Sequence, residues 1–230
     1  MILSSSPTAV FDLDGTLADT APDLIATLNL ILDGEGVPRL PAAHARELIG
    51  LGGRALIVRG LEAASREVTP ARLEALYRKF IVHYGENLCV ETALFPGVET
   101  ALDQLDEAGF RLAVCTNKIE KHSVRLLEAL GIGKRFTAVC GRDSFAYCKP
   151  DPRHLTLTVE KAGGDPRHAV MIGDSRTDVA TAKAAETPVI AVSFGYSEIS
   201  VQELGADRVV GHFDELVAAV HDCIAVAEPA

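Results

Sequence analysis

The sequence predicts an α/β fold: a Rossmann-like parallel sheet with helices on both faces and an all-helical domain inserted near its start. Beyond about residue 95 of the 230-residue chain, short apolar runs alternate with segments of helical periodicity. Such alternation is typical of parallel strands joined by right-handed crossovers. One more apolar run opens the chain, and the residues after it show helical patterns with few β-like runs. The chain is therefore predicted to have a core at residues 1–17 and 89–230 and a helical insertion at residues 18–88.

The N-terminal part begins with a strand and continues into helices. The run TAVFDLD at residues 8–14 predicts a short buried strand that ends near Asp12. The segment TAPD at residues 20–23 has the pattern of a helix start, with threonine at the N-cap and proline in the first turn. Two further helices are predicted at about 42–65 and 70–84. Apolar residues recur at helical spacing in the first helix, at Leu24, Ile25, Leu28, Ile31 and Leu32.

The second part of the chain alternates strictly between the two kinds of segment. The predicted strands are FRLAVCTN at 110–117, FTAVCGRD at 136–143, HAVMIGD at 168–174, TPVIAVSFG at 187–195 and DRVVG at 207–211. The predicted helices between them cover residues 98–109, 122–131 and 152–163, with one more before residue 187. This order predicts one parallel sheet.

The composition disfavours several classes of partner and site. The 32 acidic side chains outnumber the 22 basic ones, and a net charge of −10 argues against nucleic acid or an anionic membrane as the main partner. Five cysteines, an odd number without a C-x-x-C pair, predict neither a disulfide framework nor a zinc site. The first residues lack the pattern of a secretory signal, and no apolar run approaches the ~20 residues that span a bilayer. A soluble, cytoplasmic protein is therefore expected.

Polar side chains gather where the predicted strands end. Ligands of parallel α/β sheets bind beyond the carboxyl ends of the strands, so these side chains are expected to share one site. Converging carboxylates need a cation to offset their repulsion, and an all-oxygen site suits Mg²⁺. The polar residues at the strand ends are Asp12, Asp14, Thr16, Thr116, Asn117, Lys149, Asp174, Ser175 and Asp178.

These residue types together suit the transfer of a phosphoryl group. Thr116, Lys149 and backbone amides after the first strand could neutralise the phosphoryl oxygens. Asp12 could act as the nucleophile and form a covalent intermediate. Asp14, two positions on, could protonate the leaving oxygen and later activate water. A small phosphorylated molecule is the expected substrate.

The motifs resemble those of the haloacid dehalogenase-like hydrolase superfamily over nearly the whole chain. D-x-D-G-T is present at 12–16, the second-motif threonine at Thr116, the lysine at Lys149 and G-D-x-x-x-D at 173–178. The resemblance implies that Asp12 is the nucleophile and Asp14 the general acid and base. It implies Mg²⁺ bound by the Asp12 carboxylate, the Asp14 carbonyl and the Asp174 carboxylate, with Thr16, Ser175 and Asp178 around them. It also implies that the helical insertion is a cap that closes over the cleft.

Within the superfamily, FDLDGTLADTAPDL, FPGV, AVCTNK and KPDP look most like phosphoglycolate phosphatases. This resemblance implies 2-phosphoglycolate as substrate, whose carboxylate needs a cation near the phosphoryl site. Arg54, after the glycine-rich GLGG bend, is the candidate from the helical insertion, and Lys118 is the alternative from the core. One departure from these relatives is Glu186, which stands where they often have a helix-terminating glycine. A left-handed conformation at Glu186 would cost about 1 kcal/mol.

Other activities of the same superfamily remain open. An inorganic pyrophosphatase or a β-phosphoglucomutase-like sugar-phosphate enzyme would share Asp12, Asp14 and the cap. The presence of Asp14 disfavours a dehalogenase, which does not need that second aspartate. A non-catalytic binding protein is disfavoured because every expected catalytic position is filled. The oligomeric state, monomer or homodimer, is left open.

Overall fold

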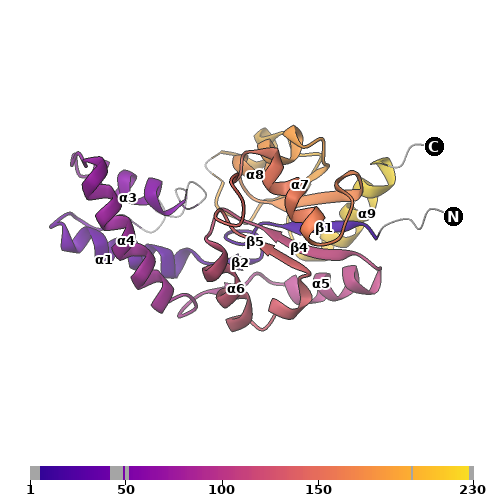
Figure 1. Ribbon diagram of the computed structural model, residues 1–230, viewed down its shortest axis with the longest axis horizontal. Helices are drawn as coiled ribbons and strands as arrows, with labels where there is room; N and C mark the ends of the chain where they lie inside the picture. Colours follow the sequence, from indigo (N-terminus) through magenta and orange to yellow (C-terminus); the bar gives the residue numbers. More distant parts are fainter. Residues whose placement is uncertain (1–5, 42–48, 50–51, 198, 228–230) are drawn as a thin grey trace.

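The structure is a computed structural model that describes residues 6–41, 49, 52–197 and 199–227. A helical part lies at one end of the molecule, and a sheet flanked by helices forms the other end, where both termini lie (Figure 1). The sheet contains six parallel strands in the order β5-β4-β1-β6-β7-β8. These strands are β1 (Thr8–Phe11), β4 (Arg111–Cys115), β5 (Ala138–Cys140), β6 (Ala169–Gly173), β7 (Val189–Val192) and β8 (Arg208–Val210). The predicted α/β fold is confirmed.

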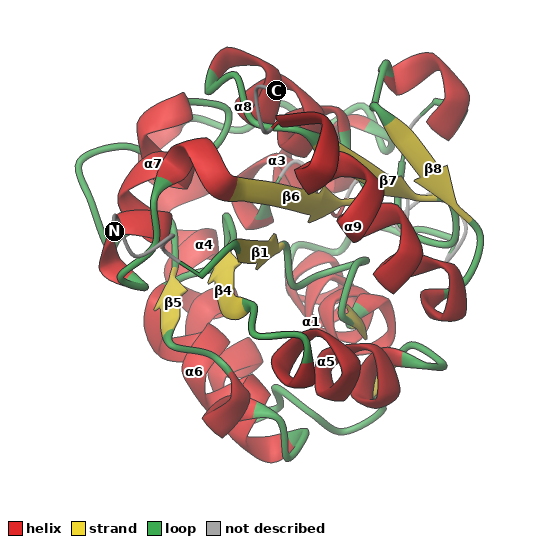
Figure 2. Cartoon of the chain, turned by 90° about the vertical axis from the view of Figure 1, so that its right-hand side faces the viewer, coloured by secondary structure: helices red, strands yellow, loops and turns green. Residues whose placement is uncertain are grey.

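Helices cover both faces of this sheet (Figure 2). Because successive side chains of a strand point to opposite faces, Phe11 and Val10 of β1 enter different hydrophobic clusters. The Phe11 face packs against α5 (Val98–Glu107), α6 (Glu120–Ala129) and α9 (Leu216–Ala227). The Val10 face packs against α7 (Pro152–Lys161) and α8 (Arg176–Ala184). Burial on both faces explains why the strands are continuous apolar runs.

The helical part, here called the cap, consists of α1 (Ala21–Gly34), α3 (Gly53–Glu62) and α4 (Pro70–Glu86) among the described residues. Their apolar faces form a hydrophobic cluster of their own, which one residue of the core, Tyr196, also joins. The helix predicted at 70–84 is confirmed as α4, whose first turn is capped by the Thr69 hydroxyl. The helix predicted at 42–65 is shorter in the structure: Gly52, at φ +85°, is the N-cap of α3, which begins at Gly53 and ends at Glu62. Residues 42–48 and 50–51 lie outside the described part. No helix in the described part of the chain has the length and apolar character to cross a membrane.

Two neighbouring linkers join the cap to the core. β2 (Ala18–Asp19) pairs in antiparallel fashion with β3 (Ala93–Leu94), so the chain leaves and re-enters the core side by side. Asp23, in the first turn of α1, accepts hydrogen bonds from the amides of Val90, Glu91 and Thr92 at 3.0–3.1 Å and from the Thr92 hydroxyl at 2.7 Å. Asp23 therefore fixes the return linker to the start of the cap. The described cap helices thus pack in a hydrophobic cluster distinct from the two clusters of the sheet, and the division of the chain at residues 18 and 88 stays a prediction.

Candidate active site

The carboxyl ends of three adjacent strands place the predicted site residues. β1 lies between β4 and β6, and the next residue after each strand is polar: Asp12, Thr116 and Asp174 respectively. The ladder continues one step beyond β1, because the Asp12 amide donates to the Ile172 carbonyl at 2.9 Å. Three side chains that are far apart in sequence thus meet at one edge of the sheet, as predicted.

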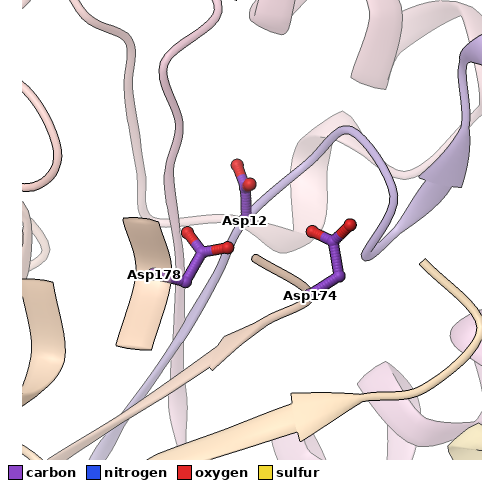
Figure 3. Close-up of side chains that lie close together, drawn as sticks. All are labelled: Asp12, Asp174 and Asp178. Carbon is purple, nitrogen blue, oxygen red and sulfur yellow. The ribbon is translucent and has the colours of Figure 1, made fainter. Parts of the chain in front are cut away.

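Three carboxylates converge at this edge. Asp12, Asp174 and Asp178 each place one carboxylate oxygen within 4.8 Å of the others, from the ends of β1 and β6 and the start of α8 (Figure 3). Burial is the largest cause that raises the pKa of Asp12, to about 6, while Lys149 acts in the opposite direction. Burial also raises the pKa of Asp174 well above its ordinary value, with repulsion from Asp178 and Asp12 adding to it.

Lys149 offsets the negative charge of two of these carboxylates, Asp12 and Asp178. Its buried ammonium lies 3.0 Å from Asp12 Oδ1 and 2.5 Å from Asp178 Oδ1. Burial lowers the pKa of Lys149, but Asp12 and Asp178 together raise it by more than burial lowers it. The pKa of Lys149 is therefore raised overall, and the side chain stays charged. The other Asp178 oxygen accepts hydrogen bonds from the Ser175 amide and hydroxyl, which completes a capping box at the start of α8. Asp178 is therefore fully engaged by protein groups.

Asp174 has no cationic partner among the described residues. One of its oxygens accepts from the Thr16 hydroxyl at 3.1 Å, and the other accepts from the Tyr196 amide at 2.6 Å. Gly15, at φ +83°, lets the backbone pass close to this carboxylate, since a Cβ there would lie 2.3 Å from Asp174 Oδ2. The D-x-D-G-T turn is thus shaped around Asp174.

The donor set at this edge fits Mg²⁺. Asp12 and Asp174 are buried carboxylates that a single lysine does not neutralise, because Lys149 is shared with Asp178. An all-oxygen pair of carboxylates is the kind of ligand set that Mg²⁺ takes. Asp12 and Asp174 would hold the ion, and its charge would offset the repulsion that raises both pKa values.

Asp14 is held by a different cation. Lys118 Nζ donates to Asp14 Oδ1 at 2.7 Å and lies 4.5 Å from the centre of the Tyr84 ring, which belongs to the cap helix α4. The Lys118 amide donates to the Thr116 hydroxyl at 3.2 Å, so a local hydrogen bond stabilises the loop after β4. Asn117, the residue between them, donates to the Lys149 carbonyl at 3.0 Å. The motif residues therefore support one another across three loops.

A cavity of about 70 Å³ connects these residues to the cap. Its core side includes Asp12, Asp14, Thr116, Asn117 and Lys118, and apolar and aromatic residues of the cap face them. Three of the side chains that line it carry a buried polar atom with no partner among the described residues: Tyr84 Oη, Asn117 Oδ1 and His122 Nδ1. A substrate or water inside the cavity could satisfy such atoms.

The structure places Arg54 differently from the sequence prediction. The glycine-rich bend lines the cavity through Gly52 and Gly53, but Arg54 is not among the lining residues. Its guanidinium donates to Glu74 at 3.0 Å and lies 3.7 Å from the centre of the Tyr77 ring. A carboxylate and an aromatic face therefore already engage the Arg54 guanidinium, away from the cavity lining.

The chain is similar to known proteins in sequence. A family model described as haloacid dehalogenase-like hydrolase matches residues 9–192. The chain belongs to the haloacid dehalogenase-like hydrolases. A protein named phosphoglycolate phosphatase from Mesorhizobium japonicum is 47% identical to this hydrolase over 92% of this chain and 93% of its own length.

Solved structures give the same relationship. A structure described as a predicted phosphoglycolate phosphatase from Haemophilus somnus 129pt superposes with a TM-score of 0.87 at 31% identity, covering 94% of this chain and 99% of that chain. A mutant of CbbY from Rhodobacter sphaeroides, in complex with xylulose-(1,5)bisphosphate, superposes with a TM-score of 0.76 at 26% identity and covers 92% of this chain and 96% of that one. The fold of this haloacid dehalogenase-like hydrolase is thus shared with proteins whose descriptions name different phosphorylated compounds.

Several residues of this hydrolase's site were not singled out from the sequence. His154 is buried in α7; it accepts from the Lys149 amide through Nδ1 at 3.1 Å, and its Nε2 lies 3.1 Å from the Gly141 carbonyl. Burial lowers the pKa of His154 to about 4, so the neutral ring is an acceptor at Nδ1 and a donor at Nε2. Tyr84, His122 and Arg142 line the cavity without belonging to any motif. No local pattern in the sequence marks them.

Proposed function

We propose that this chain is a Mg²⁺-dependent phosphomonoester hydrolase that converts 2-phosphoglycolate to glycolate and phosphate through an aspartyl-phosphate. The observation that carries this proposal is the state of Asp12. Its Oδ1 accepts from the Leu13 amide at 2.7 Å and contacts Lys149, while its Oδ2 has no partner in the described part of the chain. One oxygen is thus anchored, and the other is available to attack a phosphorus atom in the cavity.

The reaction would proceed in two displacements. In the first, Asp12 Oδ2 forms a bond to phosphorus, the bond to the glycolate oxygen breaks, and protonated Asp14 gives its proton to that oxygen. In the second, Asp14 takes a proton from water, whose oxygen attacks the phosphorus, and phosphate leaves Asp12. Mg²⁺ on Asp12 and Asp174 would supply positive charge where the phosphoryl oxygens gather. Lys149 holds the nucleophile in place, and Lys118 holds Asp14.

The substrate assignment rests on the relatives. The Mesorhizobium japonicum relative, at 47% identity, is named for phosphoglycolate. Pyrophosphate is about as small as phosphoglycolate and is the second candidate, since its distal phosphate could use the same cationic surroundings. The sugar-phosphate activity suggested by the CbbY complex is the third.

A phosphate-release assay with Mg²⁺ tests the proposal. The substrates are 2-phosphoglycolate, pyrophosphate and a set of hexose and pentose phosphates, each assayed also with a chelator present. We expect the highest kcat/KM for 2-phosphoglycolate and no turnover after chelation. Asp12→Asn should remove multiple turnover and leave the fold intact, because an amide cannot form the acyl phosphate. A preference for pyrophosphate would overturn the substrate assignment alone, and turnover by Asp12→Asn would overturn the mechanism.

A further inference from the structure

We infer that Arg142 selects the substrate by binding its carboxylate, the group at the end away from the phosphorus. This inference rests on the proposed phosphoglycolate activity. It assigns a residue to the recognition of the carboxylate, which the catalytic motifs do not explain. Arg142 follows β5 and lines the cavity together with Asp12 and Asp14. The catalytic residues recognise only the phosphoryl group, so the choice among small phosphate esters must come from other groups in the cavity.

The charge balance of the cavity singles out Arg142. Within the described part of the chain, the cationic residues that line it are Lys118 and Arg142. Lys118 is already engaged by Asp14 at 2.7 Å. The Arg142 side chain makes no hydrogen bond and no ion pair with any described residue. A half-buried guanidinium that faces a cavity without a counter-ion is suited to an anionic group of a ligand, which it can bind through two parallel hydrogen bonds.

The backbone around Arg142 is built to hold it at that place. β5 pairs with β4 so that Cys140 lies opposite Cys115, and the Arg142 amide donates to the Lys118 carbonyl at 2.9 Å. The two loops approach so closely at Gly141 that a Cβ there would lie 2.6 Å from the Lys118 carbonyl oxygen and 2.2 Å from the Glu120 amide nitrogen. Glycine at 141 is therefore needed for Arg142 to sit beside the loop that carries Thr116.

Two further contacts tie this loop to its surroundings. The Asp143 carboxylate accepts from the Glu120 amide at 2.7 Å, which fixes the residue after Arg142 to the start of α6. His154 holds the Gly141 carbonyl at 3.1 Å on the other side, and the same ring accepts from the amide of Lys149. Arg142 is thus positioned relative to the lysine that anchors the nucleophile. A loop held on both sides in this way would suit a short substrate in which a single methylene joins the carboxylate to the phosphate group.

The test compares two substrates that differ at the distal group only. 2-Phosphoglycolate carries a carboxylate where 2-hydroxyethyl phosphate carries a neutral CH₂OH. For each substrate the kcat/KM of a variant is divided by that of the wild type, so differences in intrinsic reactivity cancel. Arg142→Ala should lower this ratio for phosphoglycolate about 10- to 100-fold more than for hydroxyethyl phosphate, mainly through KM. Arg142→Lys should recover part of the loss, because it keeps the charge but not the planar fork.

Two matched arginine variants serve as controls. Arg153→Ala removes an exposed guanidinium that is bonded to Asp151 and lies over the Tyr147 ring, outside the cavity. Arg54→Ala tests the competing assignment from the cap. Neither should change the discrimination between the two substrates. The inference is overturned if Arg54→Ala reduces the discrimination between the two substrates and Arg142→Ala does not. It is also overturned if Arg142→Ala lowers kcat/KM for both substrates by one common factor.

A binding measurement separates this inference from the proposed function. In the inactive Asp12→Asn background, calorimetric titration with 2-phosphoglycolate should show a Kd that rises about 10- to 100-fold when Arg142→Ala is added. If the wild type hydrolyses pyrophosphate best and yet this shift is found, the proposed function fails and the carboxylate contact stands. If the wild type prefers phosphoglycolate and the Kd does not change, the inference fails and the proposed function stands.

Discussion

The two walls of the active-site cavity are built from opposite chemistry. The core wall is polar, and its charged side chains are held by bonds to neighbouring loops: Asp12 by Leu13 and Lys149, and Asp14 by Lys118. The described part of the cap wall is largely apolar, contributed by Leu24, Ile49, Leu56, Tyr77, Phe80, Ile81 and Tyr84. The core therefore fixes the proposed reacting groups at strand ends, and we expect the apolar cap wall to exclude water and so to strengthen the electrostatic interactions in the cavity.

The contrast predicts that charge changes in the core act on the reaction and the fold together. Lys149→Met should abolish turnover and lower the free energy of unfolding by about 3–5 kcal/mol, because Asp12 and Asp178 would remain buried without a cation. Urea denaturation and phosphate release measure the two effects. In Lys149→Met/Asp178→Asn part of the stability should return, since one uncompensated charge is gone.

A surface lysine provides the control for this variant. Lys161 lies 3.6 Å from Glu120 and is half exposed, so Lys161→Met should change the free energy of unfolding by less than about 1 kcal/mol. If Lys149→Met and Lys161→Met changed the free energy of unfolding equally, the buried ion pairs of Lys149 would contribute no more to stability than a surface ion pair.

Magnesium should stabilise the protein through the core wall. At a hundredfold excess over its Kd, the ion should raise the free energy of unfolding by about 2.7 kcal/mol. Asp174→Asn should lose most of this gain while the ion-free variant unfolds at the same or a higher temperature, because repulsion with Asp12 and Asp178 is relieved. Thermal unfolding with Mg²⁺ and with chelator measures both quantities, and Asp151→Asn, at a half-buried position outside the acidic cluster, is the control. An unchanged magnesium shift in Asp174→Asn would remove Asp174 from the metal site.

Much of the core wall could be predicted because its residues belong to local patterns. Each motif residue follows an apolar strand, and parallel strands bring their carboxyl ends to one edge, so Asp12, Thr116 and Asp174 could be placed together without coordinates. The pairing of Lys118 with Asp14 could not, since the order of the strands does not tell which way a side chain in a loop beyond a strand end points. Arg142 likewise reaches the cavity only because two loops approach at Gly141.

The cap wall was harder to predict for a physical reason. Its helices follow from apolar periodicity, but the same periodicity does not tell which apolar residue faces the cavity and which faces the other helices. The glycine-rich bend at Gly52 and Gly53 was expected near the ligand and does line the cavity. The next side chain, Arg54, is engaged by Glu74, twenty residues further on. The sequence therefore predicted that the bend lies near the ligand, but it could not predict the ion pair that Arg54 forms with Glu74.

Substitutions at two leucines of the cap distinguish the contribution of packing from that of water exclusion. Leu56 and Leu76 are both 1% exposed and belong to the same hydrophobic cluster, but only Leu56 lines the cavity. Each substitution to alanine should cost about 2–5 kcal/mol of stability. Leu56→Ala should in addition lower kcat about tenfold below Leu76→Ala, measured well below both unfolding temperatures, because water gains access to the reacting groups. Equal kcat values would mean that the cap surface contributes packing alone.

The smallest expected effect concerns two helix ends, one in each region. Glu186 after α8 and Ser65 after α3 both adopt φ +54°, and in each case the following amide bonds back to the helix, Thr187 to Ala182 and Arg66 to Leu61. Glu186 thus adopts the left-handed conformation that its relatives often give to glycine, and Ser65 is a second case, in the cap. Because a Cβ is disfavoured there, Glu186→Gly and Ser65→Gly should each raise the free energy of unfolding by about 0.5–1 kcal/mol.

The two glycine variants also measure how firmly the cap and the core are joined. Glu186→Ala and Ser65→Ala are the controls, since alanine keeps the Cβ and should not stabilise. Tyr196 of the core packs in the cap cluster, and Asp23 of the cap binds the return linker. We therefore expect both glycine variants to shift one common thermal transition, by about 1–3 °C for a chain of this size. Two transitions, with Ser65→Gly moving only one and Glu186→Gly only the other, would show that the two walls of the cavity unfold independently.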